Sequence, residues 1–298
     1  MKDNPLVSIV IINYNTAEVT IELLKSIQTE TSYHPYEIIL IDNASEKSDS
    51  ETLKEFAESN PIRLYLMDSN LGWITGVNFG FREAKGDFLL TINSDVIVEK
   101  KWLSNMVDLI QTEKDIAAIN ANIFEDGKSI VTSTNGYLDI LHGACSMFSL
   151  ESWNLVGELD DKNFEFYGSE NDWSYRARSI GYKLMLSEDS IVNHLGTSKI
   201  TAGGGLSVKK TGRIRDFLKM RLDGRVKIRA YNFTTKDWFS RQVLSELKDS
   251  FLNGYLSLLI VSYLRVLLNV KNIYIERKRR GKRTSHGIKV IQSSNLNQ

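Results

Sequence analysis

The sequence is poor in cysteine and proline, and its charges balance. Cys145 is the only cysteine in 298 residues, so an internal disulfide is excluded. No basic, apolar and small-residue pattern of a secretion signal precedes the first apolar run. These absences predict a protein of a reducing, cytoplasmic setting. The chain is 42% hydrophobic, which is enough to bury a sizeable core.

Two common phosphate-binding motifs are also absent. No Gly-x-Gly-x-x-Gly turn follows the first apolar run, and no Gly-x-x-x-x-Gly-Lys-Ser/Thr loop occurs anywhere in the chain. The sequence therefore excludes a Rossmann dehydrogenase and a P-loop enzyme.

The zero net charge conceals an asymmetry between two parts of the chain. Residues 1–202 carry 16 Lys and Arg against 31 Asp and Glu, whereas residues 203–298 carry 21 against 6. The two parts therefore have net charges of about −15 and +15. Three glycines at 203–205 mark the boundary. We predict an acidic catalytic domain over 1–202 and a basic, mostly helical region over 203–298.

Short β-branched runs alternate with helical patterns in the first hundred residues. The expected strands are 7–12, 37–42, 62–67 and 88–92, and the expected helices are 16–28, 50–59, 73–84 and 100–110. Further on, we expect a helix from Glu170 to about Ile180 and apolar runs at 183–186 and 190–193. The alternation predicts an α/β fold with a parallel sheet.

Polar side chains follow three of the expected strands. In open α/β sheets, ligands bind beyond the carboxyl ends of the strands. Any one of these residues can instead make a turn or cap a helix, but three groups together favour a ligand site. A carboxylate there can bind a divalent metal, and another can contact a nucleoside. Asp95 and Asp42 suit these roles. The polar groups are Asn13, Tyr14 and Asn15; Asp42 and Asn43; and Asn93, Ser94 and Asp95.

Several segments, taken in order, resemble family 2 glycosyltransferases, in particular the rhamnosyltransferase-like branch. The segments are VSIVIINYN (7–15), IILIDNAS (38–45), NLGWITGVNFGFREAKGDFLLTINSDV (70–96), HGACSMFSLESWNLVGELDD (142–161), GSENDWSYRARSIGYK (168–183) and NHLGTS (193–198). The resemblance covers roughly residues 5–200. It implies the GT-A fold, with a mostly parallel central sheet flanked by helices.

The same resemblance implies site residues. The metal, Mg²⁺ or Mn²⁺, is expected on Asp95 and His194, and the family's Asp-x-Asp motif here reads Asn93-Ser94-Asp95. The acceptor side is expected at Gly143 and Ala144. The donor nucleotide is expected to contact Asn13, Tyr14, Asn15, Asp42, Asn43, Asn70, Gly72, Asn78 and Asn93.

The catalytic base is expected at the start of the helix near residue 170. An inverting, single-displacement transfer needs one base to deprotonate the acceptor hydroxyl. The resemblance points to Glu170, with Asp172 as the alternative. Asp172 also has a structural interpretation, because it can form a capping box with Ser169 and an ion pair with Arg176.

The basic region indicates location more than chemistry. Residues 251–270, FLNGYLSLLIVSYLRVLLNV, predict a helix lying in a membrane interface or packed on a partner. Basic stretches at 212–229 and 271–283 favour attraction to an anionic membrane surface. No recognition motif accompanies this charge, so nucleic acid is not an expected partner. A solvated basic surface is the plain alternative.

The sequence thus predicts a metal-dependent inverting glycosyltransferase at the cytoplasmic face of the membrane. Its partners would be a nucleotide-sugar donor and a glycan or lipid-linked acceptor, in cell-surface polysaccharide synthesis. Two alternatives stay open. A nucleotidyltransferase on a related fold would release pyrophosphate, and a non-catalytic scaffold would bind the nucleotide sugar without transfer.

Overall fold

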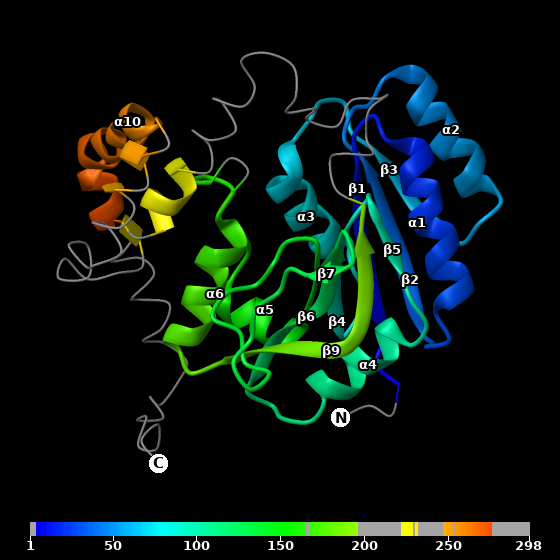
Figure 1. Cartoon of the computed structure of the whole chain (residues 1–298). Coiled ribbons are helices and arrows are strands. Elements are labelled where there is room, and N and C mark those ends of the chain that lie inside the picture. Colours follow the sequence, from blue (N-terminus) through cyan, green and yellow to red (C-terminus); the bar gives the residue numbers. More distant parts are fainter. Residues whose placement is uncertain are drawn as a thin grey trace.

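The structure, a computed structural model, describes residues 4–164, 167–195, 222–228, 230–231, 247–248, 250–252 and 254–275. Figure 1 shows one central sheet with helices on both faces. The predicted boundary at 203–205, residues 276–283 of the predicted basic stretch 271–283, and most of the stretch 212–229 lie outside the described residues.

The first half of the sheet is parallel, as the alternating pattern predicts. Strands β1 (Val7–Asn13), β2 (Tyr36–Asp42), β3 (Ile62–Leu66) and β4 (Phe88–Asn93) lie in the order β3-β2-β1-β4. They are joined by α1 (Ala17–Glu30), α2 (Lys47–Glu58) and α3 (Gly72–Glu83). All seven predicted elements are present, although α2 begins three residues before its predicted start.

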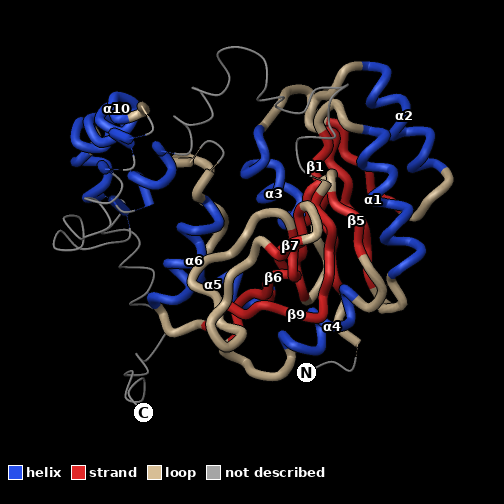
Figure 2. The backbone as a smooth tube through the Cα atoms, in the orientation of Figure 1, coloured by secondary structure: helices blue, strands red, loops and turns tan. Residues whose placement is uncertain are grey.

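The second half of the sheet is mixed, so the prediction of a mostly parallel sheet is wrong beyond β4. The order continues β8-β6-β9-β5, with β8 (Cys145–Ser149) antiparallel to β4 and β6, and β5 (Val96–Val98) antiparallel to β9. Only β6 (Ile116–Glu125) and β9 (Lys183–His194) pair in parallel there, and β7 (Lys128–Ser129) forms a hairpin with β6. The apolar runs at 183–186 and 190–193 are thus one bent strand (Figure 2).

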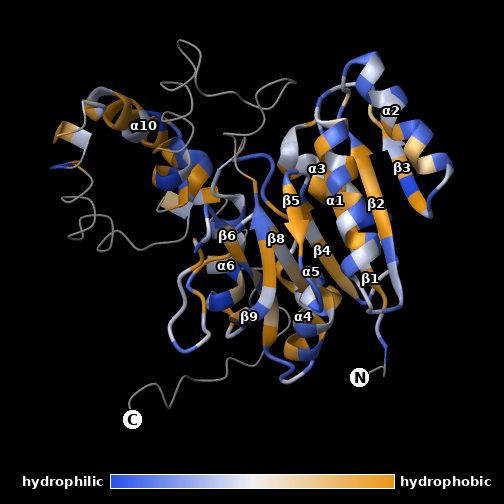
Figure 3. Cartoon of the chain, turned by 45° about the vertical axis from the view of Figure 1, so that its right-hand side comes forward, coloured by the Kyte–Doolittle hydropathy of each residue, from blue (hydrophilic) through white to orange (hydrophobic). Residues whose placement is uncertain are grey.

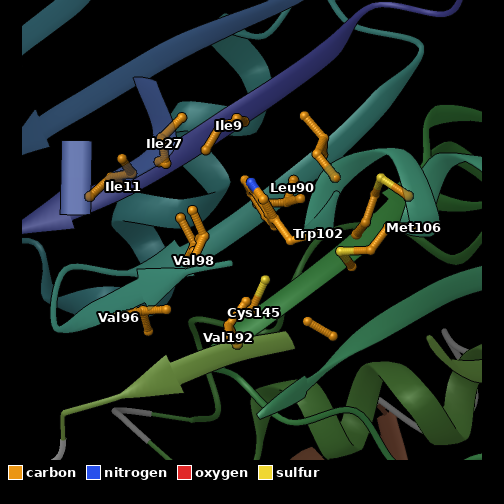
Figure 4. Close-up of a cluster of buried hydrophobic side chains, with 14 of the residues drawn as sticks. Ile9, Ile11, Ile27, Leu90, Val96, Val98, Trp102, Met106, Cys145 and Val192 are labelled. Carbon is orange, nitrogen blue, oxygen red and sulfur yellow. The ribbon is translucent and has the colours of Figure 1, made fainter. Parts of the chain in front are cut away.

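One face of the sheet is covered by α1, α2 and α4 (Trp102–Ile110). In this core cluster, Trp102 lies among Leu90 and Met106, and Cys145 lies nearby (Figure 4). The Trp102 indole nitrogen donates to Thr31 Oγ1 at 2.9 Å, so its one polar atom is satisfied. Cys145 is fully buried in this core, which agrees with its predicted role as a small core hydrophobe.

The other face is covered by α3, α5 (Leu150–Val156) and α6 (Ser169–Ser179). Phe148 of β8 packs edge-on against Trp153 and Trp173, with ring centroids 5.2 and 4.8 Å away. Side chains from the described part of the basic region, including Val226 and Leu259, belong to the same core cluster. The described part of that region is therefore packed on the α/β part of the chain.

The apolar segment at 251–270 is divided by a glycine. Gly254 has φ +74°, and the regular helix α10 runs from Leu256 to Leu268. Leu259 and Val266 on one side of α10 are buried, whereas Leu264 and Leu268 on the other side are exposed. Within the described ranges, no helix has both the length and the apolar character needed to cross a bilayer.

Candidate functional site

The candidate site lies at the carboxyl ends of β1, β2, β4, β6 and β9. These strands run in one direction, so their last residues meet at one edge of the sheet (Figure 1). The predicted polar groups after the first, second and fourth predicted strands all lie at that edge.

Asp95 and His194 are neighbours, as their predicted shared role requires. The antiparallel register of β5 and β9 places Val96 opposite His194, and the Leu195 amide donates to the Asp95 carbonyl at 2.8 Å. His194 Nε2 lies 3.2 Å from Asp95 Oδ1. Asp95 is 9% exposed, so its carboxylate is largely shielded from solvent.

Glu125, at the end of β6, contacts the other side of the His194 ring. Its Oε1 lies 2.5 Å from His194 Nδ1. Burial alone lowers the pKa of His194, but the hydrogen bonds and charges of Asp95 and Glu125 outweigh it and raise the pKa to about 9. Among the described residues, no group of three or more His, Cys, Asp or Glu side chains is arranged to hold a metal ion. The described residues would therefore supply at most two ligands here.

A buried asparagine holds the loop that precedes β8. Asn120 Nδ2 donates to the carbonyl oxygens of His142 (2.9 Å) and Cys145 (2.8 Å), and Asn120 Oδ1 accepts from the His142 amide at 2.8 Å. His142 Nδ1 accepts from the Ala144 amide. Burial, together with the nearby His194, lowers the pKa of His142, so that its imidazole is neutral at pH 7.

Gly143 in this loop lies directly against Glu170. A Cβ at position 143 would be 2.3 Å from Glu170 Oε1, so only glycine allows the carboxylate its present position. Ser169 Oγ donates to Glu170 Oε2 at 3.0 Å. Burial raises the pKa of Glu170, and the Ser169 hydrogen bond offsets this only in part. The structure thus brings the predicted base beside the predicted acceptor-side residue.

Asp172 has a structural position. Its carboxylate is fully buried and accepts from Arg176 Nε at 2.9 Å, and Arg176 also donates to the carbonyls of Val156 (2.7 Å) and Glu158 (2.8 Å). The hydrogen bonds of Arg176 to these carbonyls tie α6 to the end of α5. The predicted capping box is wrong, because the helix N-cap is Gly168 and Ser169 is the first helical residue.

The predicted donor residues on β1 and β2 are tied to one another. Asp42 is 1% exposed, and its carboxylate accepts from Asn13 at 2.9 Å, from Ser50 at 2.5 Å and from Ser45. Asn13 is fully buried, and its Oδ1 accepts from Thr16 and Thr20. These contacts engage every polar atom of the Asn13 side chain. We therefore reassign Asn13 from a donor contact to positioning Asp42.

A second network fixes the turn into α3. Asn43 Nδ2 donates to Asn70 Oδ1 at 2.9 Å, and Asn43 Oδ1 accepts from the Leu71 amide. Asn70 Oδ1 also accepts from the Gly72 amide, and Gly72 has φ +76°, a conformation that favours glycine. Tyr14 is 41% exposed beside this edge.

Among the remaining predicted residues, the side chains of Asn78 and Asn15 form hydrogen bonds to backbone atoms. Asn78 is fully buried, and its amide pairs with the Leu159 backbone through both polar atoms (2.9 and 3.1 Å). We therefore reassign it to anchoring that segment. Asn15 Oδ1 accepts from the Glu46 amide at 2.7 Å, which fixes the loop after β2. Asn93 is half-buried, and its backbone N–H donates to the Ala144 carbonyl at 2.9 Å.

Sequence reasoning missed Glu125, His142 and Asn120. Two of them, Glu125 and Asn120, lie on β6, which was not recognised although IAAINANIFE alternates apolar and polar residues in its second part. His142 was quoted within a motif but given no role. An acid directly after an apolar strand is the same signal that identified Asp42 and Asp95.

Comparisons with known proteins agree with this geometry. The chain is 29% identical to glycosyltransferase GlyG of Streptococcus pneumoniae over 125 residues, which are 42% of this chain and 41% of GlyG. It is 29% identical to the undecaprenyl-phosphate 4-deoxy-4-formamido-L-arabinose transferase of Pseudomonas savastanoi pv. phaseolicola (37% of this chain, 34% of that protein). It is 23% identical to AglE of Haloferax volcanii (64% and 67%). The chain thus spans less than half the length of the first two relatives.

Two solved structures share the fold. The mannosyltransferase PcManGT from Pyrobaculum calidifontis, in complex with GDP-Man and Mn²⁺, superposes with a TM-score of 0.59 over 95% of this chain and 86% of its own, at 16% identity. GalNAc-T7 with UDP, GalNAc and Mn²⁺ gives a TM-score of 0.61 at 16% identity, over 78% and 48% of the two chains.

The fold and the sequence agree on the family. The α/β architecture is the GT-A fold that the sequence predicts, with a mixed rather than mostly parallel sheet. The sequence profile described as glycosyl transferase family 2 matches residues 8–169, which is more than half of the chain. This chain therefore belongs to glycosyl transferase family 2.

Proposed function

We propose that this protein is an inverting glycosyltransferase in which Glu170 deprotonates the acceptor hydroxyl. The observation that carries the proposal is the difference in burial and ion pairing between the two candidate acids. Asp172 is fully buried and neutralised by Arg176. Glu170 is half-buried, packs on Gly143, has no cationic partner among the residues that the structure describes and has a raised pKa. A carboxylate with a raised pKa is a stronger base, which suits proton abstraction near neutral pH.

Asp95 and His194 fit a divalent cation at the donor diphosphate. Their facing atoms are a carboxylate oxygen and an imidazole nitrogen, a donor pair that transition-metal ions such as Mn²⁺ accept and that Mg²⁺ accepts less readily. Two protein ligands are typical where substrate phosphates complete the coordination shell. A bound cation would supply charge stabilisation for the leaving diphosphate. The Mn²⁺ named with both solved structures supports this assignment.

The donor nucleoside is proposed to lie over the ends of β1 and β2. Asp42 is held rigidly there by Asn13, Ser45 and Ser50, and Tyr14 presents an exposed ring at the same edge. Asn43 and Asn70 fix the backbone of the turn into α3. A site built on fixed strand ends and a fixed turn lowers the entropic cost of binding.

Glu170→Gln tests the proposal against its closest alternative, Asp172→Asn. Loss of a positioned base lowers the transfer rate about 10²- to 10⁴-fold, so Glu170→Gln should do so with donor affinity unchanged. Asp172→Asn should lower stability and leave the rate of the folded protein near the wild-type value. A larger rate loss in Asp172→Asn, with both variants folded and binding donor, would transfer the role of the base to Asp172.

Product analysis separates this function from the other two that the sequence leaves open. Release of a nucleoside diphosphate, together with inversion at the anomeric carbon measured by NMR, would support the glycosyltransferase proposal. Pyrophosphate release would instead indicate a nucleotidyltransferase. Donor binding with neither hydrolysis nor transfer would indicate a non-catalytic scaffold.

We further propose that the acceptor is lipid-linked and that α10 rests on an anionic membrane surface. Five apolar side chains form one exposed stripe on α10: Ile260, Val261, Leu264, Leu267 and Leu268 (46, 41, 52, 57 and 88% exposed). Figure 3 shows the apolar character of this helix in orange. The chain has no acidic residue between 250 and 275 and has six basic residues at 277–283. An apolar stripe beside basic charge is typical of interfacial helices. The lipid phosphate in the name of one relative supports a lipid-linked acceptor in cell-surface polysaccharide synthesis.

Flotation with liposomes tests the membrane proposal. The full chain should float with vesicles containing phosphatidylglycerol and should float less with neutral vesicles. Leu264→Glu and Leu268→Glu should weaken flotation, whereas Leu155→Glu, which alters an exposed leucine on α5, should not. Equal flotation of all three variants, or no preference for anionic lipid, would contradict the proposal.

A further inference from the structure

Glu125 lies at a position that the proposed function does not yet use. Phe124 on β6 pairs with Asn193 on β9, so the next residue along each strand, Glu125 and His194, come together at the sheet edge. The two ring nitrogens of His194 then face two different carboxylates. Nδ1 is 2.5 Å from Glu125 Oε1, and Nε2 is 3.2 Å from Asp95 Oδ1.

This arrangement determines which nitrogen of His194 carries the proton towards Glu125. An ionised carboxylate is only an acceptor, so a hydrogen bond to it requires Nδ1–H. Because Glu125 holds the proton on Nδ1, a binding cation displaces the proton of Nε2, the nitrogen that points to the Asp95 side. Carboxylates commonly orient metal-binding histidines in this way.

The contact of Glu125 with His194 is not explained by the local fold. The β6–β7 hairpin is closed by the pairing of Glu125 with Lys128, and its two turn residues, Asp126 and Gly127, have φ +48° and +73°. An Asp-Gly turn of this kind forms through the backbone. The Glu125 side chain is therefore free to act on His194 without being needed for the turn.

We infer that Glu125 is a positioning residue that orients His194 Nε2 towards Asp95 for a divalent cation. Glu125 is not itself placed as a ligand, because the imidazole ring lies between its carboxylate and that of Asp95. This inference rests on the cation site of the proposed function, and it adds a third residue that sets the affinity of that site.

The inference is tested by titrating the full chain with Mn²⁺ alone and measuring free Mn²⁺ by electron paramagnetic resonance. Loss of a carboxylate that is hydrogen-bonded to a metal-binding histidine typically weakens metal affinity about 10- to 100-fold. Glu125→Ala and Glu125→Gln should weaken Mn²⁺ affinity by this factor. Asp126→Asn is the matched control. It removes one negative charge from the next residue, and asparagine accepts its positive φ, so affinity should stay at the wild-type value.

A second readout does not depend on metal or on activity. At a pH above the His194 pKa of about 9, where the ring is neutral, its ¹⁵N shifts should report Nδ1–H with Glu125 present and a mixture of tautomers in Glu125→Ala. Unchanged Mn²⁺ affinity and an unchanged tautomer in Glu125→Ala would overturn the inference, provided that Asp95→Ala and His194→Ala still lose affinity. If those two variants also bind Mn²⁺ normally, the cation site of the proposed function fails together with the inference.

Discussion

Replacing Gly143 with alanine should separate catalysis from stability in this protein. The new Cβ would lie 2.3 Å from Glu170 Oε1, whereas ordinary contacts begin at 3.4 Å, so the carboxylate must move by about 1 Å. The atom that moves is the end of a flexible side chain, and Gly143 is not among the glycines with positive φ. The fold should therefore accept alanine with little loss of stability.

The rate should fall because Glu170 would no longer meet the acceptor hydroxyl. A misplacement of about 1 Å at a reacting group lowers the rate by roughly 10²-fold. We therefore expect kcat for sugar transfer to fall about 10²-fold in Gly143→Ala, with an unchanged dissociation constant for the donor. Initial-rate transfer assays and donor titrations measure the two quantities.

Gly181→Ala serves as the control for general backbone effects. Nothing lies within 4 Å of a Cβ at this position, but φ is +95°, so alanine is strained there. Its unfolding free energy should fall by about 1 kcal/mol with no change in kcat.

A double variant decides whether the effect of Gly143→Ala acts through Glu170. If it does, Gly143→Ala should have almost no further effect on the rate in a Glu170→Gln background, because the displaced group no longer takes the proton. Fully additive losses would refute the reasoning, as would wild-type kcat in Gly143→Ala alone.

Three further predictions concern the residues around this centre. Asp172→Asn removes the buried ion pair with Arg176 and should lower the unfolding free energy, measured by urea denaturation, by about 3 kcal/mol with kcat retained. Asn120→Ala removes the side-chain partners of the His142 and Cys145 backbone and should lower both that free energy, by about 2 kcal/mol or more, and kcat. The raised pKa of Glu170 should make kcat/KM fall as the pH is lowered through a midpoint above the ordinary 4.5. Ser169→Ala should move this midpoint higher, because it removes a hydrogen bond that favours the charged form.

The parallel half of the fold was predictable because its signals are local. Strands such as β1 and β2 are short apolar runs between helical patterns, and Asp42 and Asp95 follow such runs directly. The antiparallel strand β8 lies inside a segment that was read as a motif, and β6 has two small residues, Ala117 and Ala118, directly after its first residue. Neither carries a periodic signal as clear as that of β1.

The roles of individual asparagines could not be read from the sequence. Asn13 and Asn78 have the same residue type as Asn43 and lie in the motifs that suggested donor contacts. Their side chains are fully buried, and partners up to 81 residues away engage them. Only tertiary structure determines whether an amide faces a ligand or a backbone carbonyl.

Glu170 and Asp172 show the same limit. Two acids in the first turn of a helix are equivalent in the sequence, but a two-residue step turns them to different sides. Asp172 faces the core side and meets Arg176, while Glu170 faces the loop at Gly143. The preference for Glu170 came from a family resemblance and stays a prediction, and the packing of α6 supplies a physical argument for it.

The proposed cation site is a product of strand register. Asn193 of β9 pairs with Ile97 of β5 on one side and with Phe124 of β6 on the other. His194 therefore stands between Val96, the first residue of β5 and the neighbour of Asp95, and Glu125, the last residue of β6. A shift of either register by one residue would turn one of these side chains to the opposite face. The pairing changes at Ser187, where β9 skips to Ile191 against consecutive residues of β6, and Ser187 and Ser190 are hydrogen-bonded at 2.6 Å across this bulge. The bulge thus allows one strand to continue the central sheet and, after bending, to deliver His194 to both carboxylates.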